Sequence, residues 1–102
     1  MPEKALGMIG IAKKARKVVS GEFSCEKAIK AKEAYLCIVA SDASDNTKKA
    51  FRNSCDFYHV PYVEFSTKDL LGHAIGNEFR ASIAIIDEKL AKSILDKIEA
   101  CK

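Results

Sequence analysis

A basic run followed by a glycine turn is the part of this sequence best suited to binding a phosphate. Four cations lie within residues 13–17, and Lys27 follows ten residues after the last of them. Between them, residues 20–24 (Ser-Gly-Glu-Phe-Ser) are typical of a turn that opens a helix, with Ser20 as its expected N-cap. A helix N-terminus presents free backbone N–H groups and a positive dipole to an anion. The pattern predicts a site for a polyanion backbone, and its cations are Lys13, Lys14, Arg16, Lys17 and Lys27.

Phe23 falls in the first turn of that expected helix. An exposed ring there can stack on an unpaired base. Alternatively, the ring packs inward as an apolar staple at the helix start. The sequence leaves both interpretations open.

Asp42 and Asp45 are the best candidates for a catalytic or ion-binding site. They follow an apolar run, and two carboxylates there could hold Mg²⁺ or accept a phosphoryl group. Capping of the next helix explains them more simply. Gly72 and Gly76 lack the Gly-Lys-Ser/Thr ending of a phosphate loop, and no nucleophile has a recognisable base. We therefore expect no enzyme activity and no cofactor.

The four cysteines form no Cys-x-x-Cys pair and have no histidine at ligand spacing. Cys37 lies inside the apolar run 35–40, where a thiol behaves as a small hydrophobic group. We expect reduced, structural cysteines and no metal site.

Charge is distributed unevenly along the 102 residues. Residues 1–32 carry eight Lys/Arg against three acids, and residues 33–102 carry nine against eleven, which together give the net charge of +3. A basic first third favours a localised patch for a nucleic acid. No stretch approaches the roughly 18 apolar residues of a membrane span, and the N-terminus lacks the pattern of a signal peptide. We expect a soluble, cytoplasmic protein without a membrane partner.

Helical and strand patterns alternate along the whole chain, beginning and ending with a helix. The expected helices are 3–15, 21–33, 44–56, 68–75 and one from Asp87, and the expected strands are 16–19, 35–40, 60–65 and 81–86. Short buried strands between helices imply a sheet covered on both faces. The prediction is an α/β fold over residues 1–102, a single three-layer α/β/α sandwich with a mixed four-stranded sheet.

Four stretches carry a resemblance to a known family over nearly the full length. They are residues 10–17 (Gly-Ile-Ala-Lys-Lys-Ala-Arg-Lys), Gly21 with Lys27, residues 60–62 (Val-Pro-Tyr) and residues 71–80 (Leu-Gly-His-Ala-Ile-Gly-Asn-Glu-Phe-Arg). The sequence resembles the ribosomal kink-turn RNA-binding proteins of the archaeal L-seven-Ae and eukaryotic L-thirty-e type, and most closely their bacterial YlxQ-like branch.

The resemblance implies a surface that reads the shape of a sharply bent RNA. By position, Gly21 would supply the turn, Lys27 a phosphate contact, and the basic run electrostatic steering. The loop before the last strand would cover a flipped-out base. The RNA-binding residues implied or expected are Lys13, Lys14, Lys17, Ser20, Gly21, Glu22, Phe23, Ser24, Lys27, Phe79, Arg80 and Ala81.

The sequence departs from the family pattern before and after the glycine. Ser20 stands where a basic residue usually precedes it. In the archaeal pattern, Asn and Glu stand two and three residues after the glycine and read G·A pairs. Phe23 and Ser24 occupy these positions here. A benzyl group cannot make the hydrogen bond that reads a guanine edge, which is worth about 1–3 kcal/mol by analogy with base readout in DNA. The expected function is binding of a structured RNA, such as ribosomal RNA, by a monomer, with no DNA partner. A protein-interaction module on the same fold is the alternative.

Overall fold

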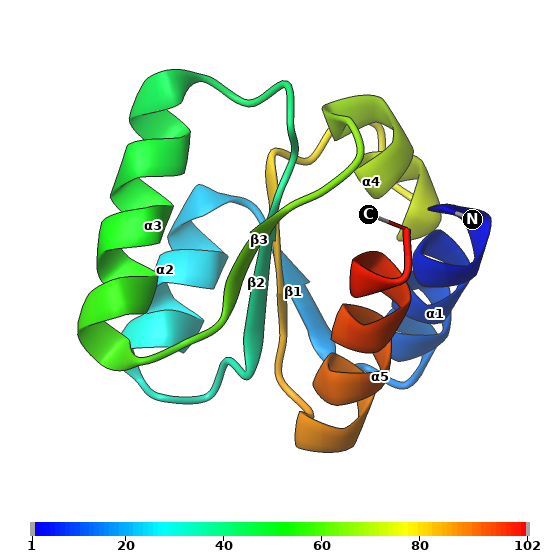
Figure 1. Cartoon of the computed structure of the whole chain (residues 1–102), viewed down its shortest axis with the longest axis horizontal. Coiled ribbons are helices and arrows are strands. Elements are labelled where there is room, and N and C mark those ends of the chain that lie inside the picture. Colours follow the sequence, from blue (N-terminus) through cyan, green and yellow to red (C-terminus); the bar gives the residue numbers. More distant parts are fainter. Residues whose placement is uncertain (1, 102) are drawn as a thin grey trace.

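The computed structural model describes residues 2–101, and its nine elements follow the predicted order (Figure 1). Helices and strands alternate throughout. In chain order they are α1 (Pro2–Lys14), β1 (Val18–Ser20), α2 (Glu22–Lys30), β2 (Leu36–Val39), α3 (Asp45–Tyr58), β3 (Tyr62–Glu64), α4 (Lys68–Ala74), β4 (Ser82–Ile85) and α5 (Glu88–Glu99).

The four strands form one mixed sheet in the order β1-β4-β2-β3. β2 pairs with β3 in parallel, and β4 pairs antiparallel with both β1 and β2. Every residue of β2 and β4 is buried, which explains the continuous apolar runs, because central strands covered on both faces need no polar alternation. Ser20, the last residue of β1, lies opposite Ile83. This register fixes which loops meet at each end of the sheet.

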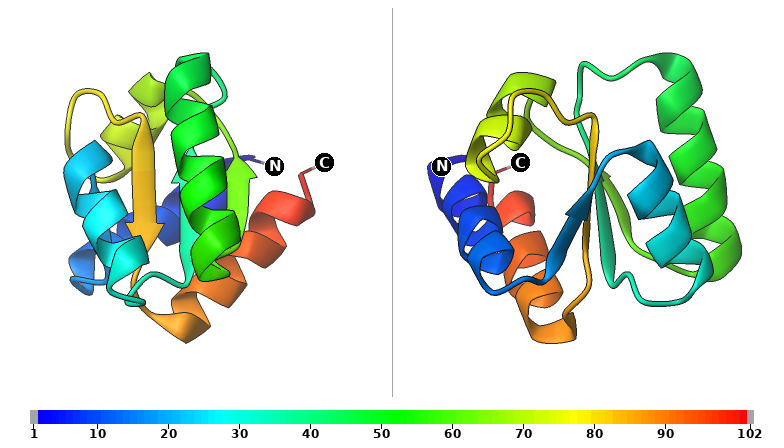
Figure 2. Two further views of the ribbon diagram at one scale, coloured as in Figure 1. Left: turned by 90° about the vertical axis from the view of Figure 1, so that its left-hand side faces the viewer. Right: turned by 180° about the vertical axis from the view of Figure 1, so that it is seen from behind.

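Helices cover both faces of the sheet. α1, α4 and α5 pack together on one face, and α2 and α3 lie on the other (Figures 1 and 2). Apolar side chains from both layers are fully buried against the sheet, including Ile9 and Ile94 on one side and Ile29 and Phe51 on the other. The predicted α/β/α sandwich with a mixed four-stranded sheet is confirmed. Within residues 2–101, no helix combines the length and apolar character needed to span a bilayer.

Helix α2 begins and ends differently from the prediction. Its N-cap is Gly21 and not Ser20, because Ser20 continues the β1–β4 ladder. The helix ends at Lys30 and not near residue 33, and Lys32 beyond it takes a left-handed conformation (φ 61°) with an exposed side chain. The buried face of the helix consists of Cys25, Ala28 and Ile29.

Helix α3 buries Phe51 and Cys55, whereas its Ala50 is exposed. The Ser44 hydroxyl caps this helix by accepting a hydrogen bond from the Thr47 N–H at 3.1 Å. Neither Asp42 nor Asp45 provides that N-cap: Asp45 is the first helical residue, and Asp42 binds a different helix, as described below.

Candidate nucleic-acid interface

The start of α2 is an open helix N-terminus. Gly21 has φ 91° and ψ 157°, a backbone conformation that favours glycine, and it turns the chain directly from β1 into α2. No side chain caps this end of the helix. The N–H groups of its first turn have no partner within the helix, so they are available to an anion. The sequence predicts an anion site at this helix start with Ser20 as its N-cap, whereas the structure has Gly21 as the N-cap.

Arg80 is held beside this turn. Its guanidinium Nε donates a hydrogen bond to Ser20 Oγ at 3.1 Å, and Nη1 donates to the Phe79 carbonyl at 2.6 Å. The Gly21 N–H donates to the Ser82 carbonyl at 3.1 Å, which joins the same two segments through their backbones. The structure therefore brings Ser20, Gly21 and Arg80 together at one end of the sheet, as the sequence-based proposal requires.

The loop that carries Phe79 and Arg80 lies directly against α4. A Cβ atom added at Gly72 would come within 3.0 Å of the Phe79 Cα atom and closer still to the Glu78 carbonyl group. The Asn77 N–H donates to the Gly72 carbonyl at 2.8 Å. Only glycine permits this approach, so Gly72 sets the position of the loop. This role of Gly72 was not predicted, although an isolated glycine inside a helical pattern is a signal for it.

Asp42 is connected to the same loop through the first residue of α4. Its Oδ1 accepts a hydrogen bond from the Lys68 N–H at 2.9 Å, at the start of α4. The Lys68 carbonyl in turn accepts from the Arg80 N–H at 3.1 Å. Asp42 is therefore a positioning residue, two hydrogen bonds away from the Arg80 backbone. The Ala81 carbonyl, the third candidate in this segment, is occupied by the Ala40 N–H at 2.9 Å.

Phe23 is not a buried staple. Its side chain is 79% exposed in the first turn of α2. It borders a shallow groove of about 580 Å³ together with Glu26, Lys27, Lys30 and Ala31. An open aromatic face with Lys27 one turn further along the helix can accept a base and an adjacent phosphate. The structure thus excludes the interpretation of Phe23 as an inward-packed staple.

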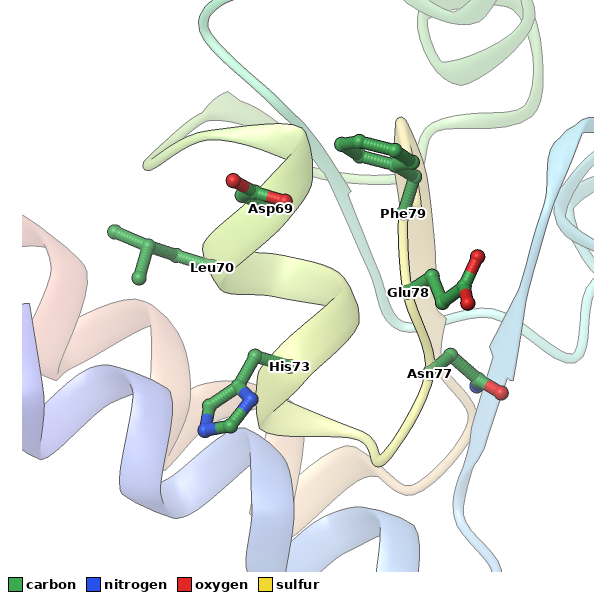
Figure 3. Close-up of a pocket in the computed structure, with 6 residues that line it drawn as sticks. All are labelled: Asp69, Leu70, His73, Asn77, Glu78 and Phe79. Atoms are coloured by element: carbon green, nitrogen blue, oxygen red, sulfur yellow. The ribbon is translucent and has the colours of Figure 1, made fainter.

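Phe79 forms the border of a second, separate pocket (Figure 3). This pocket of about 530 Å³ lies between α4 and the loop, and its lining residues are Asp69, Leu70, His73, Asn77, Glu78 and Phe79. The Phe79 side chain is 59% exposed. Two carboxylates in the lining make this pocket unfavourable for a phosphate, so the ring itself is the feature that suits a nucleic acid.

Acidic groups are also present near the start of α2. Glu22 is exposed in the first turn of α2, where its carboxylate interacts favourably with the helix dipole but repels a phosphate. Ser24, partly exposed, follows two residues later. Arg80, which is hydrogen-bonded to Ser20, and Glu22 therefore place opposite charges near the start of α2.

The basic run lies at the other end of β1. Lys13 and Lys14 form the last turn of α1, and Lys17 precedes β1, where its carbonyl accepts a hydrogen bond from the Ile86 N–H at 2.9 Å. Gly21, by contrast, bonds to Ser82. The structure therefore does not gather Lys13, Lys14 and Lys17 with Arg80.

Two of the buried thiols, Cys25 and Cys37, are unsuited to chemistry at neutral pH. Burial raises the pKa of the Cys25 thiol to about 12. The pKa of the Cys37 thiol is raised chiefly by a hydrogen bond with Cys55, and burial raises it further. Among residues 2–101, no cluster of three His, Cys, Asp or Glu side chains is arranged to hold a metal ion.

Curated proteins of similar sequence cover almost the whole chain. RNA-binding protein YlxQ of Bacillus subtilis (strain 168) is 37% identical over 92 residues, which is 90% of this chain and 92% of that protein. The protein of the same name from Enterococcus faecium is 34% identical over 95% of this chain and 93% of its own. Large ribosomal subunit protein eL8 of Thermoplasma volcanium is 31% identical over 98% and 87%, respectively.

Solved structures of other proteins have the same fold. A Bacillus halodurans protein of unknown function superposes with a TM-score of 0.92 at 31% identity and covers 94% of this chain and 97% of its own. The 15.5kD RNA binding protein of Giardia lamblia gives a TM-score of 0.79 at 23% identity over 95% and 86%, a likeness of fold. Residues 3–95 match the family model described as "Ribosomal protein L7Ae/L30e/S12e/Gadd45 family". This match and the matches to the three curated relatives each cover nine-tenths or more of the chain, and they show that the chain belongs to that family.

Proposed function

We propose that this protein binds a structured RNA with a sharp bend, without catalysing a reaction. The RNA contacts the open N-terminus of α2 and the loop of residues 77–81. The observation that carries the proposal is the hydrogen bond between Arg80 and Ser20, because it fixes a cationic loop beside an uncapped helix start. Curated relatives named as RNA-binding proteins support it.

Each part of this surface suits a different part of the RNA. The free N–H groups of the first turn of α2 and the remaining guanidinium nitrogens of Arg80 bind phosphates. Lys27 adds a phosphate contact two turns into the helix. Phe23 and Phe79 present open rings for unpaired bases, which a bent RNA exposes.

Phe23 changes what is recognised at the G·A position of the family pattern. A ring stacks on any base and reads no hydrogen-bonding edge, so the protein selects the bend and the unpaired bases more than a base identity. An internal loop of ribosomal RNA offers these features, and we include it among the candidate ligands. The function is performed in the cytoplasm by a single copy of the chain.

Filter binding across a salt series tests the proposal. The probes are a kink-turn RNA, a ribosomal RNA fragment with a bulged internal loop, and a straight duplex of equal length. We expect preference for the bent RNAs, and a weaker affinity and smaller salt slope for Lys27→Ala and Arg80→Ala, since each neutralised phosphate adds to the slope. The matched control is Lys92→Ala, an exposed lysine on α5.

Two results would contradict the proposal. One is equal affinity for bent and straight RNA that does not change with salt. The other is an affinity that Arg80→Ala and Lys27→Ala leave unchanged while protein partners persist in a pull-down after nuclease treatment. That second result favours a protein-interaction module on this fold.

A further inference from the structure

Four cations at the start of β1 form a surface that the proposed site does not use. Residues 13–17, here called the basic turn, contribute Lys13, Lys14, Arg16 and Lys17, and all four side chains are exposed. The two ion pairs found within residues 2–101 join Lys30 to Glu26 and Lys48 to Glu64, so none of the four has an acidic partner within 4.0 Å. Nearby Asp87 caps α5 by accepting from the Leu90 N–H.

The basic turn has a fixed backbone. Arg16 adopts a left-handed conformation (φ 63°), and its N–H donates to the Lys13 carbonyl at 3.0 Å. The Lys17 N–H donates to Ala12 at 2.9 Å, and the Lys17 carbonyl accepts from Ile86. The helix dipole accounts for lysines in the last turn of α1, but Arg16 and Lys17 lie beyond the helix. Held close together, the four like charges repel one another, and a bound polyanion relieves that repulsion.

Room for a backbone strand exists beside the basic turn. Lys13 and Lys14 border a groove of about 390 Å³ between α1 and the end of α4. Its walls include Gly7 and Gly76, at which an added Cβ would meet nothing within 4 Å. The two lysines therefore stand at the edge of an open concavity and not against a packed surface.

The basic turn and the proposed RNA site lie at opposite ends of the same edge strand. β1 is flanked by Lys17, which bonds to Ile86, and by Gly21, which bonds to Ser82. Four residues of extended chain span about 13 Å, which is several base-pair steps. Figure 2 (right) shows the end of α1, β1, the start of α2 and the loop before β4 on one side of the molecule.

We propose that the basic turn binds the phosphate backbone of a double-helical arm that continues from the bent RNA. This inference rests on the function proposed above. It requires one arm of that RNA to be long enough to reach the basic turn. The deep, narrow major groove of an RNA double helix keeps side chains away from the base edges, so these cations contact phosphates without reading sequence. Continuity with the α2 site favours an RNA arm over an acidic protein.

The test combines one multiple variant with three RNAs. Lys13, Lys14, Arg16 and Lys17 are all replaced by Ala in the full chain. The control replaces Lys49, Lys89, Lys92 and Lys97, which are also exposed and have the same total charge but lie on α3 and α5. The probes are a long-armed kink-turn RNA and two versions in which one arm or the other is cut to a few base pairs. Thermal melts verify folding of both variants.

We expect the basic-turn variant to lose tenfold or more in affinity for the long-armed RNA, with a salt slope smaller by about two to four. The control variant should lose much less. When the arm that contacts the basic turn is shortened, the wild type and the basic-turn variant should bind the RNA with equal affinity. Equal losses in the two variants, or a loss independent of arm length, would overturn the inference.

The two proposals fail in different ways. If Arg80→Ala weakens binding but the basic-turn variant matches its control, only the arm contact is wrong. If no bent RNA binds the wild type, the proposed function is wrong, and the arm contact with it. If the basic-turn variant loses affinity for polyglutamate and not for RNA, the surface binds an acidic protein.

Discussion

Arg80 and Ser20, sixty residues apart in the chain, are joined by a hydrogen bond of 3.1 Å between the guanidinium Nε and the hydroxyl Oγ. The bond connects the loop before β4 to the last residue of β1. It holds the guanidinium group beside the uncapped start of α2, so the two segments of the candidate interface have a fixed relation before any ligand binds. This preorganisation lowers the entropy cost of binding.

Ser20→Ala should weaken RNA binding while leaving the fold intact. The substitution removes the acceptor for Arg80 and allows the guanidinium group to move. A hydrogen bond to a charged group contributes about 1.5–3 kcal/mol, and partial exposure here reduces that, so we expect a loss of about threefold to tenfold. Filter binding measures it, with Ser93→Ala on the exposed face of α5 as control. Unchanged affinity would show that the bond does not position Arg80.

Gly72→Ala should displace the loop of residues 77–79. The new methyl group meets backbone atoms of Glu78 and Phe79, and neither can move without shifting the loop. We expect a loss of about 1–3 kcal/mol in the free energy of unfolding, together with weaker RNA binding. Gly7→Ala is the matched control, because nothing lies within 4 Å of its added Cβ, and alanine in a helix should stabilise the protein by up to about 1 kcal/mol. Equal melting temperatures for the two variants would contradict this account.

Phe23→Leu should weaken binding of RNA with unpaired bases, and Phe23→Tyr should retain it. Stacking on one base contributes about 1–3 kcal/mol, which corresponds to roughly fivefold to 150-fold in affinity. Because Phe23 is 79% exposed, neither change should affect folding. Phe57→Leu is a suitable control, since that ring is 74% exposed on α3. Equal RNA affinities of the Phe23→Leu and Phe23→Tyr variants would rule out stacking, because only tyrosine keeps an aromatic ring.

Asp42→Ala should lower the melting temperature more than Asp45→Ala. Asp42 accepts a hydrogen bond from the Lys68 N–H at the start of α4, a contact worth about 1 kcal/mol. Asp45 offers only a favourable charge in the first turn of α3. Because the Asp42 carboxylate is occupied, millimolar Mg²⁺ should not shift the melting temperature of the wild type. A clear stabilisation by Mg²⁺ that Asp42→Ala abolishes would revive the ion-binding alternative.

Alkylation at pH 8 should modify Cys101 and spare Cys25 and Cys37. Cys101 is partly exposed, whereas burial raises the pKa of Cys25 to about 12, and the hydrogen bond with Cys55 raises that of Cys37. The unfolded chain releases these thiol protons near pH 9, and the folded chain does not, so stability should fall as pH rises above about 9. Mass spectrometry after iodoacetamide treatment, with and without urea, measures the labelling. Modification of Cys25 without urea would contradict the burial described.

Regular elements were predictable from the sequence because their signals are local. The apolar run 35–40 indicated a strand covered on both faces, and all four residues of β2 are buried. A glycine just after a helical pattern is typical of a left-handed residue at the end of a helix, and Gly76, after α4, has φ 78°. The family match likewise confirms the non-catalytic interpretation of the chain.

Contacts between distant segments were not predictable in the same way. Ser20 looks like an N-cap because serine before a glycine and a helix is common, but its pairing with Ile83 keeps it in a strand. Asp42 precedes α3 in sequence yet binds Lys68, which only the sheet order explains. Candidate site residues from one segment, such as Gly21 and Lys27, could be found together. Their relation to Arg80 required the structure.

The position of β4 has a consequence for how the protein is made. β4 lies between β1 and β2, although it follows the other three strands along the chain. A nascent chain that ends before Ser82 leaves β1 without its neighbour and Gly21 without its backbone partner. The corner that joins Gly21 to Arg80 can therefore form only after β4 has left the ribosome, so translation products truncated before Ser82 should lack the candidate interface.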